Sequence, residues 1–300
     1  MSRGATVAGG TRRELERVLA ERLGSVQEAR WLADDVLGRP GAGADEVTEE
    51  ARARLDELAS RRCAGEPLQY VLGRWPFRTL DLVVDGRALI PRPETEQLVG
   101  VALGELGALA VRPSGAVVVD LGTGSGAIGL SLAAEAAGTY DPLQVWCCDE
   151  SDDALALAGE NLGRLARRDP RAAAAVTLSA GHWWGALPES LVGCVQLVVS
   201  NPPYVSEGEW ADLDPGVRCF EPRSALVAGA GRDGTPGLAA IEAVLDGAAR
   251  WLARPGVAVV ELAPPQAGAA QALARAAGAG AVRVERDLAG RDRMLVATWL

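Results

Sequence analysis

The chain of 300 residues contains no lysine, since all 30 of its basic residues are arginine, and it has a single histidine, His182. The lack of lysine excludes Schiff-base chemistry, pyridoxal phosphate enzymes and Walker-type phosphate loops. One histidine argues against most zinc sites and against a histidine-based catalytic triad. We therefore expect no metal site, and a reaction that needs neither residue type.

The net charge, the length of the apolar runs and the number and spacing of the cysteines exclude further classes of function. The formal net charge of −10 argues against a broad phosphate-binding surface, so direct contact with nucleic acid is not expected. No apolar run is long enough to span a bilayer, so no membrane partner is expected. The five cysteines lack metal-like spacing, and their odd number without a secretory signal peptide favours reduced thiols and a cytoplasmic protein.

A glycine-rich turn follows a valine-rich strand expected over Val117–Leu121. Its residues are Gly122, Thr123, Gly124, Ser125 and Gly126. The glycines allow a tight turn and the close approach of a ligand to the backbone. The helix expected from Gly126 to Ala137 would point its N-terminus at that ligand. Gly124-x-Gly126-x-x-Gly129 also fits the dinucleotide fingerprint, which alone is a weak signal.

Two carboxylates flank this turn. Asp120 is unfavourable beside a pyrophosphate but favourable beside the ammonium of an amino-acid moiety, which S-adenosylmethionine carries without any phosphate. The next strand, Gln144–Cys148, ends at Asp149, where a carboxylate can accept hydrogen bonds from ribose hydroxyls. The alternative role for Asp149 is to cap the helix that starts near Asp152. The pattern favours S-adenosylmethionine as the cofactor.

The tetrapeptide Asn201-Pro202-Pro203-Tyr204 follows a buried strand expected over Val195–Val199. Each proline closes the α region to the residue before it, so the strand ends in a stiff corner. Open α/β sheets bind ligands at this edge. The corner would offer the Asn201 amide and the Pro202 carbonyl as acceptors for a planar NH₂ group, with Tyr204 against its face. The alternative is a proline-rich loop with Tyr204 packed on the surface.

These two motifs and three further stretches resemble the HemK/PrmC family of protein-glutamine methyltransferases, which modify peptide chain release factors. The three stretches are Gly65-Glu-Pro-Leu-Gln-Tyr-Val-Leu-Gly73, Leu89-Ile-Pro-Arg-Pro-Glu-Thr-Glu96 and Phe220-Glu-Pro-Arg-Ser-Ala-Leu226. The resemblance runs from about Gly65 to the C-terminus. It implies that the methyl acceptor is the glutamine of the Gly-Gly-Gln loop in bacterial release factors, and hence a role in translation termination.

The residues expected to act in this reaction follow from the two motifs. Asn201 and Pro202 are expected to be catalytic and, with Pro203 and Tyr204, to bind the substrate amide. The residues expected to contact the cofactor are Gly122, Thr123, Gly124, Ser125, Gly126, Asp149, Trp183 and Asn201.

Two segments depart from the family pattern. His182 stands where the family commonly has an acidic residue, and we expect it at the surface. The resemblance places Trp183 beside the adenine, while core packing is expected for one of Trp183 and Trp184. The segment Glu261-Leu-Ala-Pro-Pro-Gln266 differs from a family segment that usually has glycine after the glutamate. This departure concerns the local loop rather than the chemistry.

Three domains are expected along the chain. Residues 1–74 form a small helical domain that recognises the substrate, with helices over Thr11–Leu23, Val26–Leu37 and Asp45–Cys63. Residues 75–91 form a β-hairpin linker that turns at Asp85-Gly86. Residues 92–300 alternate strands and helices, which is typical of an α/β domain with a mostly parallel sheet. The resemblance implies a Rossmann-like class I methyltransferase fold with seven strands and a hairpin-like edge. The later strands are expected at Val176–Ser179, Val195–Ser200, Val257–Leu262, Ala281–Glu285 and Met294–Thr298.

Three other functions stay open from the residues alone. An adenine or RNA amino-methyltransferase would use the same tetrapeptide, although the acidic charge disfavours it. A nicotinamide-dependent oxidoreductase would use the Gly124–Gly129 fingerprint. A non-catalytic protein that binds S-adenosylmethionine as a structural ligand would not need the intact Asn-Pro-Pro-Tyr.

Overall fold

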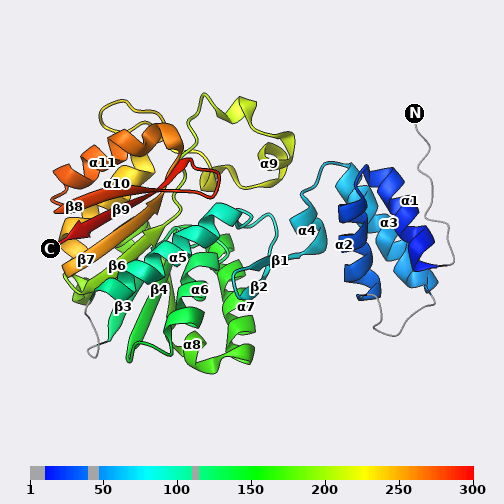
Figure 1. Ribbon diagram of the computed structural model, residues 1–300, viewed down its shortest axis with the longest axis horizontal. Coiled ribbons are helices and arrows are strands. Elements are labelled where there is room, and N and C mark those ends of the chain that lie inside the picture. Colours follow the sequence, from blue (N-terminus) through cyan, green and yellow to red (C-terminus); the bar gives the residue numbers. More distant parts are fainter. Residues whose placement is uncertain (1–10, 40–46, 110–114) are drawn as a thin grey trace. The chain divides into compact units, whose positions relative to one another are not determined.

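The computed structural model describes residues 11–39, 47–109 and 115–300, and it forms two compact units (Figure 1). One unit comprises the chain up to Arg74 together with Asp214–Phe220. The other comprises Trp75–Leu213 and Glu221–Leu300. Each is described by itself.

The first unit is helical. Its elements are α1 (Arg12–Leu23), α2 (Val26–Leu37), α3 (Glu49–Cys63), α4 (Leu68–Leu72) and α9 (Pro215–Phe220). Thr11 and Glu14 form a capping box, in which the Thr11 N–H donates to Glu14 Oε2 at 3.0 Å. Gly24 ends α1 in the left-handed conformation. The predicted start of the third helix, Asp45, lies outside the described residues.

Leucines that recur at helical spacing form the core of this unit, among them Leu15, Leu19, Leu32, Leu55 and Leu58, all 0% exposed. Arginine supplies the cross-links between helices. Arg62 on α3 reaches Glu28 on α2 at 2.8 Å. The bidentate geometry of this guanidinium suits a partly buried pair better than an ammonium would.

The second unit is built on the expected sheet of seven strands in the order β5-β4-β3-β6-β7-β9-β8. Its strands are β3 (Ala116–Leu121), β4 (Leu143–Asp149), β5 (Val176–Ala180), β6 (Val195–Ser200), β7 (Leu252–Glu261), β8 (Ala281–Arg286) and β9 (Asp292–Trp299). The first five run parallel, whereas β9 pairs antiparallel with both β7 and β8. The hairpin-like edge is therefore confirmed.

Helices cover both faces of this sheet. The elements are α5 (Pro93–Ala108), α6 (Ala127–Ala136), α7 (Asp152–Arg168), α8 (Pro170–Ala174), α10 (Ala239–Trp251) and α11 (Ala267–Ala276). Buried residues of α10 and α11 pack with Val119 and Leu121 of β3. The side chain of Asp120, which points to the other face, contacts α6 instead.

The predicted turn of the hairpin linker, at Asp85-Gly86, was wrong. The two-stranded sheet pairs β1 (Arg74–Phe77) with β2 (Leu80–Val83), so its turn is at Arg78-Thr79. Arg78 adopts a positive φ of 51°, which few non-glycine residues do, and its sequence gave no turn signal. The Asp85-Gly86 pair instead makes a local turn, because the Asp85 carboxylate accepts the Arg87 N–H at 3.0 Å.

Candidate active site

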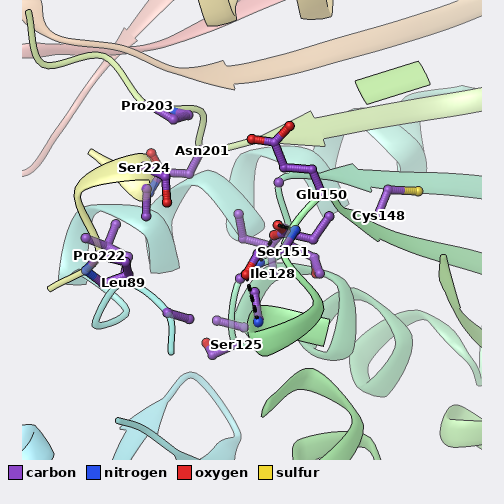
Figure 2. Close-up of a pocket in the computed structure, with 18 of the residues that line it drawn as sticks. Leu89, Ser125, Ile128, Cys148, Glu150, Ser151, Asn201, Pro203, Pro222 and Ser224 are labelled. Carbon is purple, nitrogen blue, oxygen red and sulfur yellow. Dashed lines mark hydrogen bonds between the residues drawn. The ribbon is translucent and has the colours of Figure 1, made fainter. Parts of the chain in front are cut away.

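A pocket lies at the carboxyl ends of β3, β4 and β6, where parallel strands deliver their loops to one edge (Figure 2). The space within it that no protein atom fills is about 1050 Å³, open solvent at its mouth included. Asn201 and Pro203 lie on one flank with Pro222 and Ser224, while Cys148 and Glu150 lie on the other. Of the predicted site residues, the pocket wall includes Gly122, Thr123, Gly124, Ser125, Asp149, Trp183, Asn201 and Pro203.

Three predicted site residues do not line this pocket: Gly126, Pro202 and Tyr204. Gly126 is the N-cap of α6 with a φ of 83°, so its left-handed backbone conformation lets the loop turn into the helix. Pro202 is buried. The Tyr204 side chain is largely buried, and desolvation, with Glu261 nearby, raises the pKa of its phenol to about 12.

Asp120 holds the glycine-rich loop from behind rather than facing a ligand. Its Oδ2 accepts a hydrogen bond from Thr123 Oγ1 at 2.6 Å and from the Gly129 N–H at 2.9 Å. The residue is 0% exposed, so the expected contact with a ligand ammonium is not supported. Burial raises the pKa of this carboxyl to about 7, although both hydrogen bonds oppose the shift.

Asp149 presents its carboxylate at the pocket wall. Its Oδ2 accepts the Gly124 N–H at 2.8 Å, and its Oδ1 accepts the Ser151 N–H at 3.0 Å. Burial raises the pKa of this carboxyl, while those backbone donors lower it. The capping alternative was wrong, because Ser151 is the N-cap of α7 and accepts the Ala154 N–H.

The adjacent tryptophans separate into two environments. Trp184 is buried, donates Nε1–H to the Val244 carbonyl at 3.0 Å and stacks on Trp251. Trp183 lines the pocket, and its backbone φ of 47° is a strained value for a residue with a side chain. The left-handed backbone at Trp183 directs the side chains of Trp183 and Trp184 to different sides. His182 has 72% of its side chain exposed, as expected.

The corner after β6 is held by side chains from two distant segments. Asn201 Nδ2 donates to Thr95 Oγ1 at 3.3 Å. Gln266 Nε2 donates to the Tyr204 carbonyl at 3.0 Å, which ties the variant Glu261–Gln266 segment to the corner. A Cβ on Gly237 would lie 2.2 Å from that same carbonyl oxygen, so only glycine fits there.

Sequence reasoning missed part of the wall. Ile90 and Pro91, which precede α5, and Thr95 in its first turn line the pocket. Pro222 and Ser224, which follow α9, line it as well. Glu221 joins these two stretches, because its carboxylate accepts the Ile90 N–H at 3.0 Å and pairs with Arg92. The signal was present in the stretches Leu89–Glu96 and Phe220–Leu226, which served only to support the resemblance.

The wall fits S-adenosylmethionine better than a dinucleotide. Asp149 offers acceptor oxygens for hydroxyls, and Trp183, Ile128 and Cys148 offer apolar contact for a base. The Gly124 N–H that would meet a pyrophosphate already donates to Asp149. Arg87 at the rim is neutralised by Asp85 and Glu160 at 2.7 Å each. A sulfonium and an ammonium suit such a wall, whereas two phosphates do not.

Two family models match the chain: the PrmC N-terminal domain over residues 11–73 and the Methyltransferase small domain over residues 106–213. The chain is 38% identical to the "Release factor glutamine methyltransferase" of Gloeobacter violaceus, over 94% of each chain. It is 41% identical to the protein of the same name from Bordetella pertussis, over 89% of this chain and 92% of that one.

Among solved structures, the fold is similar to the N-terminal domain of human METTL16 in complex with SAH. The TM-score is 0.52, with 13% identity over 90% of this chain and 92% of that chain. At this identity the likeness concerns the fold alone. Within the described residues, no helix is long and apolar enough to cross a membrane.

Proposed function

The chain belongs to the family of release factor glutamine methyltransferases, and we propose that it methylates the glutamine side chain in the Gly-Gly-Gln loop of a peptide chain release factor. It is an S-adenosylmethionine-dependent enzyme. One observation carries the proposal: Asn201 lies at the wall of the pocket that the glycine-rich loop and Asp149 also form. A planar NH₂ group at this corner would face the place where a methyl donor fits.

The proposed work of the corner is to hold a poor nucleophile. An amide nitrogen reacts slowly because its lone pair is delocalised into the carbonyl. Asn201 Oδ1, at the pocket wall, would accept a hydrogen bond from one of its N–H groups and so fix its orientation. Positioning of this kind supplies about 7–11 kcal/mol in favourable cases. When bound, S-adenosylmethionine supplies a sulfonium methyl group. The Asn201 oxygen would then stabilise positive charge on the nitrogen, whose proton leaves to solvent.

Residues around the corner are proposed to bind the cofactor. Asp149 would accept hydrogen bonds from the ribose of the cofactor, and Trp183 would pack against its adenine. Gly122, Thr123, Gly124 and Ser125 would line the path of its amino-acid part. The wall composition described above supports these assignments.

We further propose that residues 1–74 form the domain that recognises the protein substrate. Two of the four exposed large apolar side chains among the described residues, Val26 and Trp31, lie on α2. Exposed tryptophan is enriched where proteins bind each other. We expect Trp31→Ala to raise the KM for whole release factor while leaving the KM for a short Gly-Gly-Gln peptide unchanged. Equal effects on both substrates would contradict this role.

The substrate class is tested by incubation of the enzyme with radiolabelled S-adenosylmethionine and cell extract. A labelled protein band that is identified as a release factor is the expected result. Label in RNA or DNA, with the release factor unmodified, would favour the adenine amino-methyltransferase that shares the Asn-Pro-Pro-Tyr corner. The same extract with the Asn201→Ala enzyme is the matched control.

A further inference from the structure

A buried hydrogen-bond chain leads from Asn201 away from the pocket. Asn201 Nδ2 lies 3.3 Å from Thr95 Oγ1, and Thr95 Oγ1 lies 2.8 Å from Glu261 Oε2. Thr95 is 4% exposed and Glu261 is 1% exposed. The three residues come from separate places in the chain: the position after β6, the first turn of α5 and the last position of β7. None of the proposed chemistry so far uses Thr95 or Glu261.

When Glu261 is ionised, the protons along this chain have one consistent arrangement. An ionised carboxylate only accepts hydrogen bonds, so Glu261 takes the single hydroxyl proton of Thr95. The Thr95 oxygen can then only accept on its other side, which requires the NH₂ group of Asn201 to face it. Because the amide is planar, the Asn201 oxygen points away from Thr95. The chain of contacts therefore sets which end of the amide is available at the pocket wall.

We propose that Thr95 and Glu261 are positioning residues that fix the Asn201 amide with its oxygen, rather than its NH₂ group, toward the methyl-accepting nitrogen. The proposal rests on the role of Asn201 in the proposed function. Without the two partners, the amide could turn by half a rotation. Its NH₂ group would then face the NH₂ group of the substrate. Because both groups are donors, the hydrogen bond that positions the substrate would be lost.

Protonation of Glu261 would reverse the polarity of this chain. A neutral Glu261 can donate to Thr95, whose hydroxyl is then free to donate to the Asn201 oxygen. Burial raises the pKa of Glu261 to about 7, while the Thr95 hydroxyl lowers it. The active orientation belongs to the ionised form, so it is lost as the pH falls through about 7. The other groups that face this carboxylate are Arg293, Arg92, Glu94 and Tyr204.

The first test compares Thr95→Val with Thr95→Ser. Valine keeps the shape of the side chain and removes the hydroxyl, whereas serine keeps the hydroxyl. We expect Thr95→Val to lower the single-turnover methylation rate of a Gly-Gly-Gln peptide about ten- to a hundredfold, as a misplaced catalytic group does. Calorimetry should give an unchanged affinity for S-adenosylmethionine, and Thr95→Ser should restore most of the rate. A wild-type rate in Thr95→Val, or equal losses in both variants, would overturn the proposal.

The second test does not depend on the folding of Thr95→Val. The rate of the wild-type enzyme, with both substrates saturating, should fall on the acid side of about pH 7. Glu261→Gln has no proton to gain, so we expect this acid limb to disappear whatever the absolute rate. An acid limb that persists in Glu261→Gln would overturn the proposal.

Asn201→Ala separates this inference from the proposed function. A wild-type rate in Asn201→Ala would refute the role of Asn201 and the positioning role together. An inactive Asn201→Ala beside a fully active Thr95→Val would refute the positioning role alone.

Discussion

Two corners at the same edge of the sheet are built by opposite means. The corner after β3 is made of glycines and is held through backbone N–H groups, by Asp120 at Gly129 and by Asp149 at Gly124. The corner after β6 is stiffened by two prolines and is held by Thr95 at the side-chain amide of Asn201 and by Gln266 at the Tyr204 carbonyl. One corner is shaped by the absence of side-chain atoms, and the other depends on a particular side chain.

Under the proposed function, this difference separates cofactor binding from chemistry. Substitution by any residue other than proline leaves a backbone N–H in place, so the β3 corner should fail mainly when a new atom intrudes or when a carboxylate is lost. Either change should weaken cofactor binding or stability. The β6 corner should fail when a single functional group is removed, and the failure should be in rate. Substitutions at the two corners therefore distinguish the two modes of construction.

The largest effect is expected at the β6 corner. Asn201→Ala removes one acceptor from the proposed site, and the loss of such a group costs about 3–4 kcal/mol in the barrier. Single-turnover kinetics with a Gly-Gly-Gln peptide would measure it. Calorimetry should show that S-adenosylmethionine still binds, since the β3 corner is intact. A near-full turnover rate would contradict the proposed role of Asn201.

Asp149→Ala should produce the reverse pattern. In the proposed site it would remove a charge-assisted contact to the ribose, worth about 1.5–3 kcal/mol, and it frees the Gly124 N–H. The dissociation constant for S-adenosylmethionine, measured by calorimetry, should rise accordingly. The rate at saturating cofactor should change much less than in Asn201→Ala. An unchanged dissociation constant would show that Asp149 acts only on the loop.

Gly129→Ala should break the β3 corner by intrusion. The added Cβ would lie 2.3 Å from the buried Cys147 Sγ and 3.2 Å from Asp120 Oδ2. Overpacking of this kind costs about 1–3 kcal/mol of unfolding free energy. Gly268→Ala on α11 is the matched control, because its Cβ would meet nothing within 4 Å. Denaturant unfolding should show a loss for the first variant and none for the second. Equal stabilities would refute the steric account.

The smallest effect concerns the pH dependence of stability. The raised pKa of Asp120, about 7, means that the folded protein keeps a proton that the unfolded chain releases near pH 4. Between these values stability from this group falls as the pH rises. Asp120→Asn removes this titratable group. The free energy of unfolding of the variant, relative to that of the wild type, should therefore increase between pH 5.5 and pH 8, a range that brackets the pKa of about 7. The exposed Asp153→Asn has the same charge change and should show no such trend in denaturant unfolding. A parallel trend in both variants would contradict a special role for burial.

Sequence patterns were sufficient for the strands of the large sheet. Apolar runs predicted the central strands β3 and β6 to within one residue, because strands buried on both faces are apolar throughout. The predicted start of β7, Val257, was five residues late, since the strand begins at Leu252. The stretch around Arg78 carried no such signal, since its turn depends on an unusual φ of one residue. The turn was therefore predicted at Asp85-Gly86, which has a typical turn sequence, instead of at Arg78-Thr79.

The pocket wall was predictable where a motif is contiguous and not where the fold assembles it. Four residues of the glycine-rich loop and Asn201, which line the pocket, were identified from local sequence. Thr95 and Glu261 are 166 positions apart, and only the packing of α5 against β7 brings them together. The expected role of Asp120 failed for a related reason. Local sequence gives the end of a strand but not whether its side chain faces the ligand or the helix behind it.

The central claim is that the β6 corner holds a glutamine amide for methylation, and mass spectrometry of a release-factor loop peptide tests it most directly. The account predicts one added methyl group on the glutamine of Gly-Gly-Gln after incubation with enzyme and S-adenosylmethionine. The modification should be absent when that glutamine is replaced by alanine and when the enzyme carries Asn201→Ala. An unmodified glutamine in the peptide and in whole release factor, with an enzyme that binds the cofactor, would contradict it.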